Sequence, residues 1–381
     1  FYSNTIQNCN TGIAVMGFAA ASPFTLGDSG NDIGGLSSSD GNTIINYGGG
    51  GASTAVGIRA NHQWGLNVSY NTINNNNGSG VNHTNILRGI WAQAGLSANV
   101  TINNNSITLN SSAVGALACV GIENGIGSTA ASNTVSISNN TFTGTYTTAT
   151  TGTVTGILNT ASATNVNING NTVQNFNLGG TGNWISIMQN VAGSVNVNIN
   201  NNTLKDCNIT STGTFTGISN NGTVSGSVTM SGNTVSGMTK NTTTTVNWMN
   251  TASITAAAIL TMNDNVIVNN TVTAAATAVT MNCFNAGTST YTFNNNYISN
   301  NAITGITAGV ATLNGFNNTT IGALQDNITN NTIRRLYITG TSTSLHAIHG
   351  ITTTSAASSN KAITNNNISN LYTTSTISSS I

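Results

Sequence analysis

Residues 166–173 read Val-Asn-Ile-Asn-Gly-Asn-Thr-Val, and nearly the same phrase returns at residues 135–142 and 197–204. Apolar residues alternate with polar ones on both sides of an asparagine cluster, which is the two-residue period of a strand with one buried face. The asparagine and glycine between the two short strands favour a tight turn, because both tolerate the left-handed backbone conformation. Self-similarity of this kind predicts a repeat architecture.

The last asparagine of the phrase, which we call the anchor, occurs twelve times at intervals of 29 to 38 residues. The residue two places after the anchor is always apolar, and the residue three places before it is apolar in every repeat except one, where Ser39 stands. These two columns distinguish a true repeat from the accidents of an asparagine-rich chain. The anchors are Asn4, Asn42, Asn71, Asn105, Asn140, Asn171, Asn202, Asn233, Asn265, Asn296, Asn331 and Asn366.

A second phrase, Gly-Ile, follows many anchors by about 16 residues and begins at residues 57, 89, 121, 156 and 217. It predicts a third strand, so that each coil has three strands and three turns. One coil cannot bury its apolar residues alone, whereas stacked coils form a continuous core. The sequence therefore predicts an all-β fold, a right-handed parallel β-helix of about twelve coils that extends over residues 1–381 as one segment. Twelve coils would form a rod on the order of 55 Å long.

In such a stack the anchors lie above one another, and we expect their side-chain amides to donate and accept hydrogen bonds along the axis. The alternative is that these asparagines are simply good turn formers. Both roles can fall on the same residue, since the turn needs a left-handed residue and the stack favours an amide.

The recurring phrase resembles the strand–turn–strand segment of right-handed parallel β-helix proteins. In its long, nearly uncharged and asparagine-rich form, the chain is most similar to the giant secreted β-helix adhesins and surface filaments of Bacteroidota. This resemblance covers essentially the whole chain. It implies the fold directly, and it implies an adhesive or structural role more loosely, because one fold serves many functions.

The composition restricts the functions that need consideration. Only 14 of the 381 residues are charged, seven of each sign, so the chain has no basic or acidic surface for nucleic acid or an anionic membrane. No apolar run is long enough to span a bilayer. The chain begins at Phe1 without a leader-like segment, so we expect a piece of a longer repeat protein. The scarcity of charge favours an extracellular or cell-surface location.

The search for catalytic chemistry finds one cluster of acids, Asp28, Asp32 and Asp40, in the longest interval between anchors. These carboxylates are a weak candidate for a Ca²⁺ site and the only candidate for paired-carboxylate catalysis. The competing interpretation is structural, because Asp-Ser-Gly-Asn-Asp is typical of tight turns. Nothing else has metal-ligand or nucleophile spacing, so we expect no catalytic residue, no metal and no cofactor.

The cysteines and tryptophans give two further expectations. Cys9, Cys119, Cys207 and Cys283 fall at least two coils apart, beyond disulfide reach, so four free and mostly buried thiols are predicted. Three tryptophans lie near the third strand and are candidates for surface contact with a glycan or a protein. Two of them, Trp91 and Trp248, are each one residue away from an inward position and should face out; the third is Trp184.

Three functions remain open on the sequence alone. The first is a non-catalytic structural or adhesive segment of an extracellular filament, which associates through lateral or end-to-end contacts. The second is a polysaccharide-binding or polysaccharide-cleaving β-helix protein. The third, an ice-binding solenoid, is suggested by Thr-x-Thr at residues 153–155 and 214–216, but ice binding needs a regular array over many coils and two such pairs do not make one.

Overall fold

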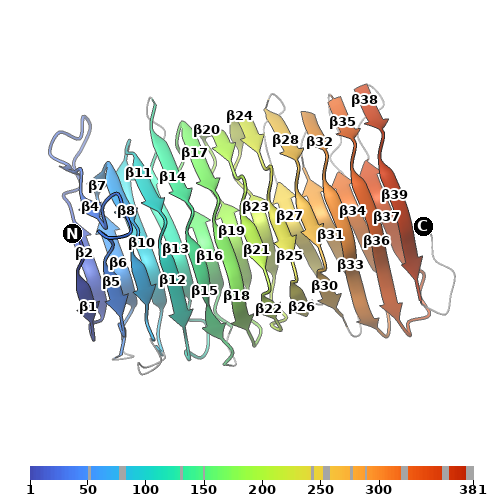
Figure 1. Cartoon of the computed structure of the whole chain (residues 1–381), viewed down its shortest axis with the longest axis horizontal. Coiled ribbons are helices and arrows are strands. Elements are labelled where there is room, and N and C mark those ends of the chain that lie inside the picture. The colour runs from blue at the N-terminus through green and yellow to red at the C-terminus, as the bar shows by residue number, and fades with distance from the viewer. Residues whose placement is uncertain are drawn as a thin grey trace.

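The computed structural model of the chain is a rod of stacked β-strands, with its two termini at opposite ends (Figure 1). The structure describes residues 1–49, 53–76, 83–128, 132–148, 151–241, 244–251, 258–274, 278–287, 290–318, 325–353 and 360–374. Within these ranges there is no helix, and hence none that could cross a membrane.

Nearly all strands belong to three long sheets, and every strand pair is parallel. Sheet 1 holds the strands that follow the anchors: β1(Thr5–Gln7), β5(Thr43–Ile45), β9(Thr72–Asn74), β12(Ser106–Asn110), β15(Thr141–Tyr146), β18(Thr172–Leu178), β21(Thr203–Lys205), β22(Asn208–Ile209), β25(Thr234–Ser236), β26(Thr239–Asn241), β29(Val266–Val268), β30(Thr271–Thr273), β33(Tyr297–Ile306), β36(Thr332–Gly340) and β39(Asn367–Thr373).

Sheet 2 holds the strands that contain the Gly-Ile phrase or its equivalent: β2(Thr11–Met16), β6(Ala55–Asn61), β10(Leu87–Leu96), β13(Cys119–Gly127), β16(Val154–Asn159), β19(Trp184–Gln189), β23(Phe215–Asn220), β27(Thr245–Thr251), β31(Val279–Ala286), β34(Ala311–Asn318) and β37(Ala347–Thr353).

Sheet 3 holds the strands that precede the anchors: β4(Asp32–Ile33), β8(Leu66–Ser69), β11(Val100–Asn103), β14(Thr134–Ser138), β17(Asn165–Asn169), β20(Ser194–Asn198), β24(Val224–Thr229), β28(Ile259–Asn263), β32(Thr290–Asn294), β35(Gln325–Thr329) and β38(Asn360–Thr364). A small additional sheet pairs β3(Asp28–Ser29) with β7(Gln63–Trp64).

The predicted three-strand coil is confirmed. Each coil contributes a strand to sheet 1, then to sheet 2, then to sheet 3, and the next anchor follows at the turn back into sheet 1. Sheets 2 and 3 have eleven strands each, which corresponds to about ten full turns from the first strand to the last. The estimate of about twelve coils was slightly high, because it counted one coil for each of the twelve anchors, whereas sheets 2 and 3 stack eleven strands each in the described residues.

The core lies between the three sheets and is built from the columns that the sequence predicts. From Ile44 to Ile333, the residue two places after the anchor is at most 1 % exposed, and the equivalent column in sheet 3 is fully buried from Val68 to Ile328. The break at Ser39 is explained by an insertion. Ile33, not Ser39, is paired with Val68, so residues 34–41 form an extra segment between the strand and the anchor.

The predicted asparagine ladder is present along the whole described stack. In all eleven steps the Nδ2 of one anchor donates to the Oδ1 of the next, over 2.8–3.2 Å. The backbone N–H of the same anchor donates to the same Oδ1. Most anchors also donate to a backbone carbonyl of the preceding coil, as Asn140 does to Ile102. The amides thus satisfy backbone groups that the turn would otherwise leave buried and unpaired.

The expectation that one residue fills both roles in the turn was wrong. The left-handed conformation falls on the residue before the anchor, with φ between 53° and 67° at eleven of the twelve turns. Asparagine is common there, but Tyr70, Asp264 and Gly170 also occur. The anchor is therefore selected for its amide, and its neighbour for its backbone.

The four cysteines are free, and Cys119, Cys207 and Cys283 are buried in the core whereas Cys9 is half-buried. Burial raises the pKa of the thiols of Cys119 and Cys207 to about 12. These thiols behave as small apolar core residues.

Candidate functional site

The outer face of sheet 2 carries two rows of side chains whose positions are fixed by the Gly-Ile phrase. In β10 the glycine and isoleucine of the phrase, Gly89 and Ile90, both point inward and are buried, so that the residues on either side, Arg88 and Trp91, point outward. The glycine is required by crowding, since a Cβ on Gly89 would lie 2.5 Å from the carbonyl oxygen of Gly121 in the next coil. The strand therefore departs from strict alternation at this point.

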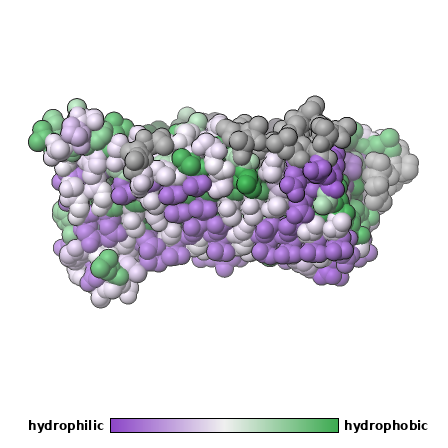
Figure 2. All heavy atoms as spheres, turned by 90° about the horizontal axis from the view of Figure 1, so that it is seen from above, coloured by the Kyte–Doolittle hydropathy of each residue, from purple (hydrophilic) through white to green (hydrophobic). Residues whose placement is uncertain are grey.

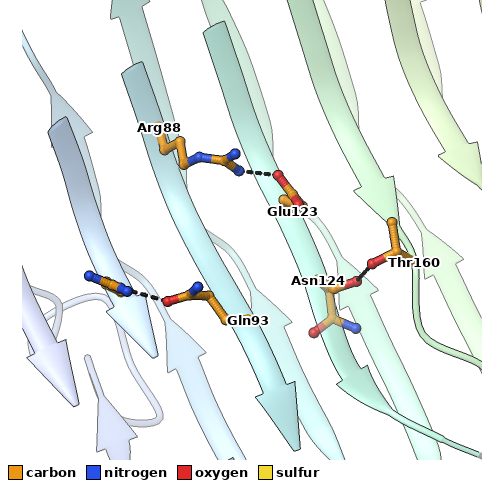
Figure 3. Close-up of polar contacts among 6 residues, drawn as sticks. Arg88, Gln93, Glu123, Asn124 and Thr160 are labelled. Atoms are coloured by element: carbon orange, nitrogen blue, oxygen red, sulfur yellow. Dashed lines mark hydrogen bonds and ion pairs between the residues drawn. The ribbon is translucent and has the colours of Figure 1, made fainter. Parts of the chain in front are cut away.

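These rows bring scarce charged residues together near the N-terminal end of the rod. Register pairs Arg59 of β6 with Trp91, and pairs Trp91 with Glu123 of β13, so three consecutive coils contribute to one cluster. Gln93 lies two residues further along β10. We call Arg59, Arg88, Trp91, Gln93 and Glu123 the outer cluster. Figure 3 shows three of its polar members, Arg88, Gln93 and Glu123.

Each guanidinium of the outer cluster contacts the tryptophan and a polar partner. The Cζ of Arg88 lies 4.2 Å from the centroid of the Trp91 ring, and that of Arg59 lies 5.0 Å from it. Arg88 is ion-paired with Glu123, and Arg59 donates from Nε to the Oε1 of Gln93 at 2.6 Å. Two guanidiniums and one carboxylate leave the cluster with one net positive charge. Such a surface fits an acidic or hydroxyl-rich ligand, and it also stabilises the coils through cation–π contact.

Of the predicted contact residues, only Trp91 lies on the outer surface, where it is half-buried. The prediction was wrong for Trp184 and Trp248, which are fully buried. Trp184 occupies an inward column of sheet 2, packs 5.2 Å from the Phe176 ring and donates to the Oγ of Ser186.

Trp248 fails for a different physical reason. It occupies the column in which the preceding coil has Gly217 and the following coil has Cys283, where the strand turns two successive residues inward. Its ring meets that of Phe215 edge-on at 5.0 Å. The sequence prediction assumed strict alternation through this point. The same assumption hid Arg59 and Arg88. A signal for Arg59 was available, because Arg59, Trp91 and Glu123 each follow an isoleucine of the Gly-Ile phrase.

The three N-terminal acids do not assemble into one site. The Oδ2 of Asp28 accepts from the side-chain amides of Asn31 and Gln63, both at 2.8 Å. Asp32 accepts from the side chain of Asn67 at 2.7 Å and from the hydroxyl of Tyr2 at 2.9 Å. The hydrogen bond to Asp32 raises the pKa of Tyr2.

Asp40 accepts from the hydroxyl of Ser37 in the inserted segment. Asp32 and Asp40 line an open recess of about 260 Å³ together with Tyr2, Gly35 and Leu36, and Asp28 is not part of it. In the described residues no three side chains of the kind that bind metals come together. The arrangement favours the structural interpretation, in which the carboxylates hold the insertion and the first coils in place.

A scan against protein-family models and searches of curated proteins and of solved structures found no match to this chain.

Proposed function

We propose that this chain is a structural and adhesive segment of a large extracellular surface protein or filament, and that it carries out no catalysis. The observation that carries the proposal is the uninterrupted ladder of twelve anchors above a continuous core. A stack in which every coil repeats the same hydrogen bonds is suited to bear load and to hold long surfaces at fixed spacing.

Three further features support the proposal. The resemblance of the repeated phrase to the giant secreted adhesins and filaments of Bacteroidota favours a cell-surface location and a longer parent protein. The chain is almost free of charge, which suits an exterior surface that must not attract nucleic acid or other polyelectrolytes. Hydrophilic residues form a band along the rod, so the surface available to partners is long and regular rather than a single pocket (Figure 2).

Immunogold electron microscopy of the cells that produce the chain tests this function. Antibodies against the purified rod should decorate filaments or the outer surface of intact cells. Label confined to the interior of permeabilised cells would contradict the proposal, as would release of sugars from a polysaccharide panel by the purified chain.

A second candidate, polysaccharide binding, is favoured by the outer cluster. Trp91 offers an aromatic surface, and the neighbouring guanidiniums of Arg59 and Arg88 can donate to hydroxyl or carboxylate oxygens. In a glycan array, binding should be lost in Trp91→Ala and retained in Leu158→Ala, which changes an outward residue of β16 two coils further along. Equal binding by both variants would remove the outer cluster from consideration.

A further inference from the structure

The outer face of sheet 3 is a lattice of short, neutral, hydrogen-bonding side chains. Its strands alternate between buried apolar residues and half-buried polar ones, as the pattern of β17 shows. One outward row continues through nine consecutive strands in direct register. Its members are Asn67, Thr101, Ser136, Asn167, Asn198, Thr229, Thr261, Thr292 and Asn327.

A second row lies two residues further along the chain in each coil, and all of its members are half-buried except Ser69, which is buried. It consists of Ser69, Asn103, Ser138, Asn169, Asn200, Ser231, Asn263, Asn294 and Thr329. Every member of both rows is Asn, Ser or Thr. A shorter third row on the other side of the first continues the pattern, with one apolar member, as Thr134, Asn165, Asn196, Ser227, Ile259, Thr290 and Gln325. We call these rows the polar lattice.

Hydrogen bonds between coils hold the lattice side chains at the spacing of the strands. Asn198 donates to the Oδ1 of Asn167 at 2.9 Å, and Asn196 donates to the Oδ1 of Asn165 at 3.1 Å. An amide has two donor hydrogens and an acceptor oxygen with two lone pairs, so each of these side chains keeps capacity for an external partner. The rows repeat at about 4.8 Å along the rod and lie about 7 Å apart across it.

We infer that the polar lattice is a lateral docking surface for the same face of a second copy of this chain; this inference rests on the proposed function and names the surface through which the filament forms. The argument is the match of repeats. A second copy has the same strand spacing by construction, so hydrogen bonds that form at one rung can form at every rung, as in cross-β assemblies. A ligand with a different repeat falls out of step within a few rungs.

The chemistry of the lattice also fits a second copy. Its side chains both donate and accept, so the face is complementary to itself under a two-fold rotation, as closed dimers require. The three rows contain no charged residue from Asn67 to Thr329, so two copies face each other without like-charge repulsion. The carboxylate nearest to the lattice is Asp32, which precedes Asn67 in the first row and accepts a hydrogen bond from it, so an acidic or a basic partner finds no counter-charge on the lattice itself.

The area is sufficient for a weak dimer. Nine strands and three rows span about 40 Å by about 13 Å, or roughly 500 Å² on each rod. Two such faces bury roughly 1,000 Å², which is the lower limit for a specific interface. Association of this segment should therefore be weak and concentration-dependent, and because the face is neutral it should change little between low and high salt.

The test compares two double variants with wild type by sedimentation velocity over a concentration series. Thr229→Lys with Thr292→Lys places two charges in the first row of the lattice, two coils apart, at side chains that face outward. Thr172→Lys with Thr234→Lys places the same charges at the same coil spacing on the outer face of sheet 1. Circular dichroism and thermal melting establish that both variants fold.

Wild type and the sheet 1 variant should associate, whereas the lattice variant should stay monomeric or weaken at least tenfold. A monomeric wild type at every concentration overturns the inference, as does equal loss of association in both variants. A third outcome is that all three proteins remain monomeric, and that wild type binds ice or an insoluble neutral glucan whereas the lattice variant does not. This outcome would overturn the inference and assign the face to that other occupant. Because immunogold labelling of cells does not depend on self-association, the failure of this inference leaves the proposed function standing, and the converse also holds.

Discussion

Asn171 donates twice to one atom of Asn202, from its backbone nitrogen at 2.9 Å and from its side-chain Nδ2 at 3.1 Å, and the acceptor in both bonds is Oδ1. Asn202 in turn donates to the backbone carbonyl of Ile168 and to the next anchor, Asn233. One buried amide therefore serves four groups in three coils. Its contribution depends on both neighbours, which explains why the column tolerates no other residue in this chain.

Replacement of one anchor should be far more damaging than replacement of the residue before it. Asn202→Ala leaves the buried N–H of Asn171 and the carbonyl of Ile168 without their side-chain partner, at a cost of about 3 kcal/mol. Asn201 is exposed and left-handed, and glycine occupies its place in the coils on both sides, so Asn201→Gly should change stability by less than about 0.5 kcal/mol. Urea unfolding of both variants checks this. Equal destabilisation would mean that the ladder adds nothing beyond turn formation.

The Gly-Ile phrase gives a second prediction. A Cβ on Gly121 would lie 2.5 Å from the carbonyl oxygen of Gly156 and 2.8 Å from the Phe142 ring, so Gly121→Ala should destabilise the rod by about 1–3 kcal/mol through steric strain. A Cβ on Gly49 would meet no atom within 4 Å, so Gly49→Ala is the matched control with little expected effect. Thermal melting of the two variants is the measurement, and similar melting temperatures would argue against close contact between the coils at this column.

The fold was predictable because its determinants are local and repeated. The anchor and the apolar columns recur every coil, so the twelve copies reinforce one another, and the register of Ile6 with Ile44 or of Ile298 with Ile333 follows from them. The outer cluster was not predictable in the same way. Its position depends on two successive inward residues in sheet 2, a local departure that the alternation rule does not contain.

Irregular intervals were the other source of error. The insertion of residues 34–41 moved the apolar column from Ser39 to Ile33, and only the pairing of Ile33 with Val68 reveals this. The polar lattice was hidden for a related reason. A row of Asn, Ser and Thr has no apolar signature, so its continuity becomes visible only when the register of sheet 3 is known.

The tryptophans separate by environment, which gives a third prediction. Trp248→Ala removes a fully buried ring and should cost about 3–5 kcal/mol, whereas Trp91→Ala removes an outer ring between two guanidiniums and should cost about 1–2 kcal/mol. In the folded wild-type protein, a collisional quencher should reduce the emission of Trp91, which is the part of the fluorescence that Trp91→Ala lacks. It should leave the emission of Trp184 and Trp248 largely unchanged. Efficient quenching of the Trp248 emission, which is the part of the wild-type fluorescence that Trp248→Ala lacks, would contradict the inward position of Trp248.

Lys240 gives a prediction on pH dependence. Its side chain is fully buried, and Nζ donates to the backbone carbonyls of Ser211 and Asn241 at 2.5 and 2.6 Å. Burial lowers the pKa of this lysine to about 8 from its ordinary value of 10.5. Between these two values the unfolded chain binds more protons than the folded chain, so the contribution of Lys240 to the free energy of unfolding rises with pH there and is constant below about pH 8.

Lys240→Met isolates this contribution, because methionine keeps most of the apolar stem and carries no charge. The stability of Lys240→Met relative to wild type should be greatest at neutral pH and should decrease steadily above about pH 8, as wild-type Lys240 loses its proton in the folded state. The buried thiols of Cys119 and Cys207 act in the opposite direction, lowering stability above about pH 9, but they do so equally in both proteins and cancel in the difference.

Lys205→Met, on the outer face of sheet 1 one coil earlier, controls for the loss of one positive charge. Urea titrations of the three proteins at a series of pH values measure these differences. If the difference in the free energy of unfolding between Lys240→Met and wild type does not change with pH, the Lys240 ammonium is not held away from water.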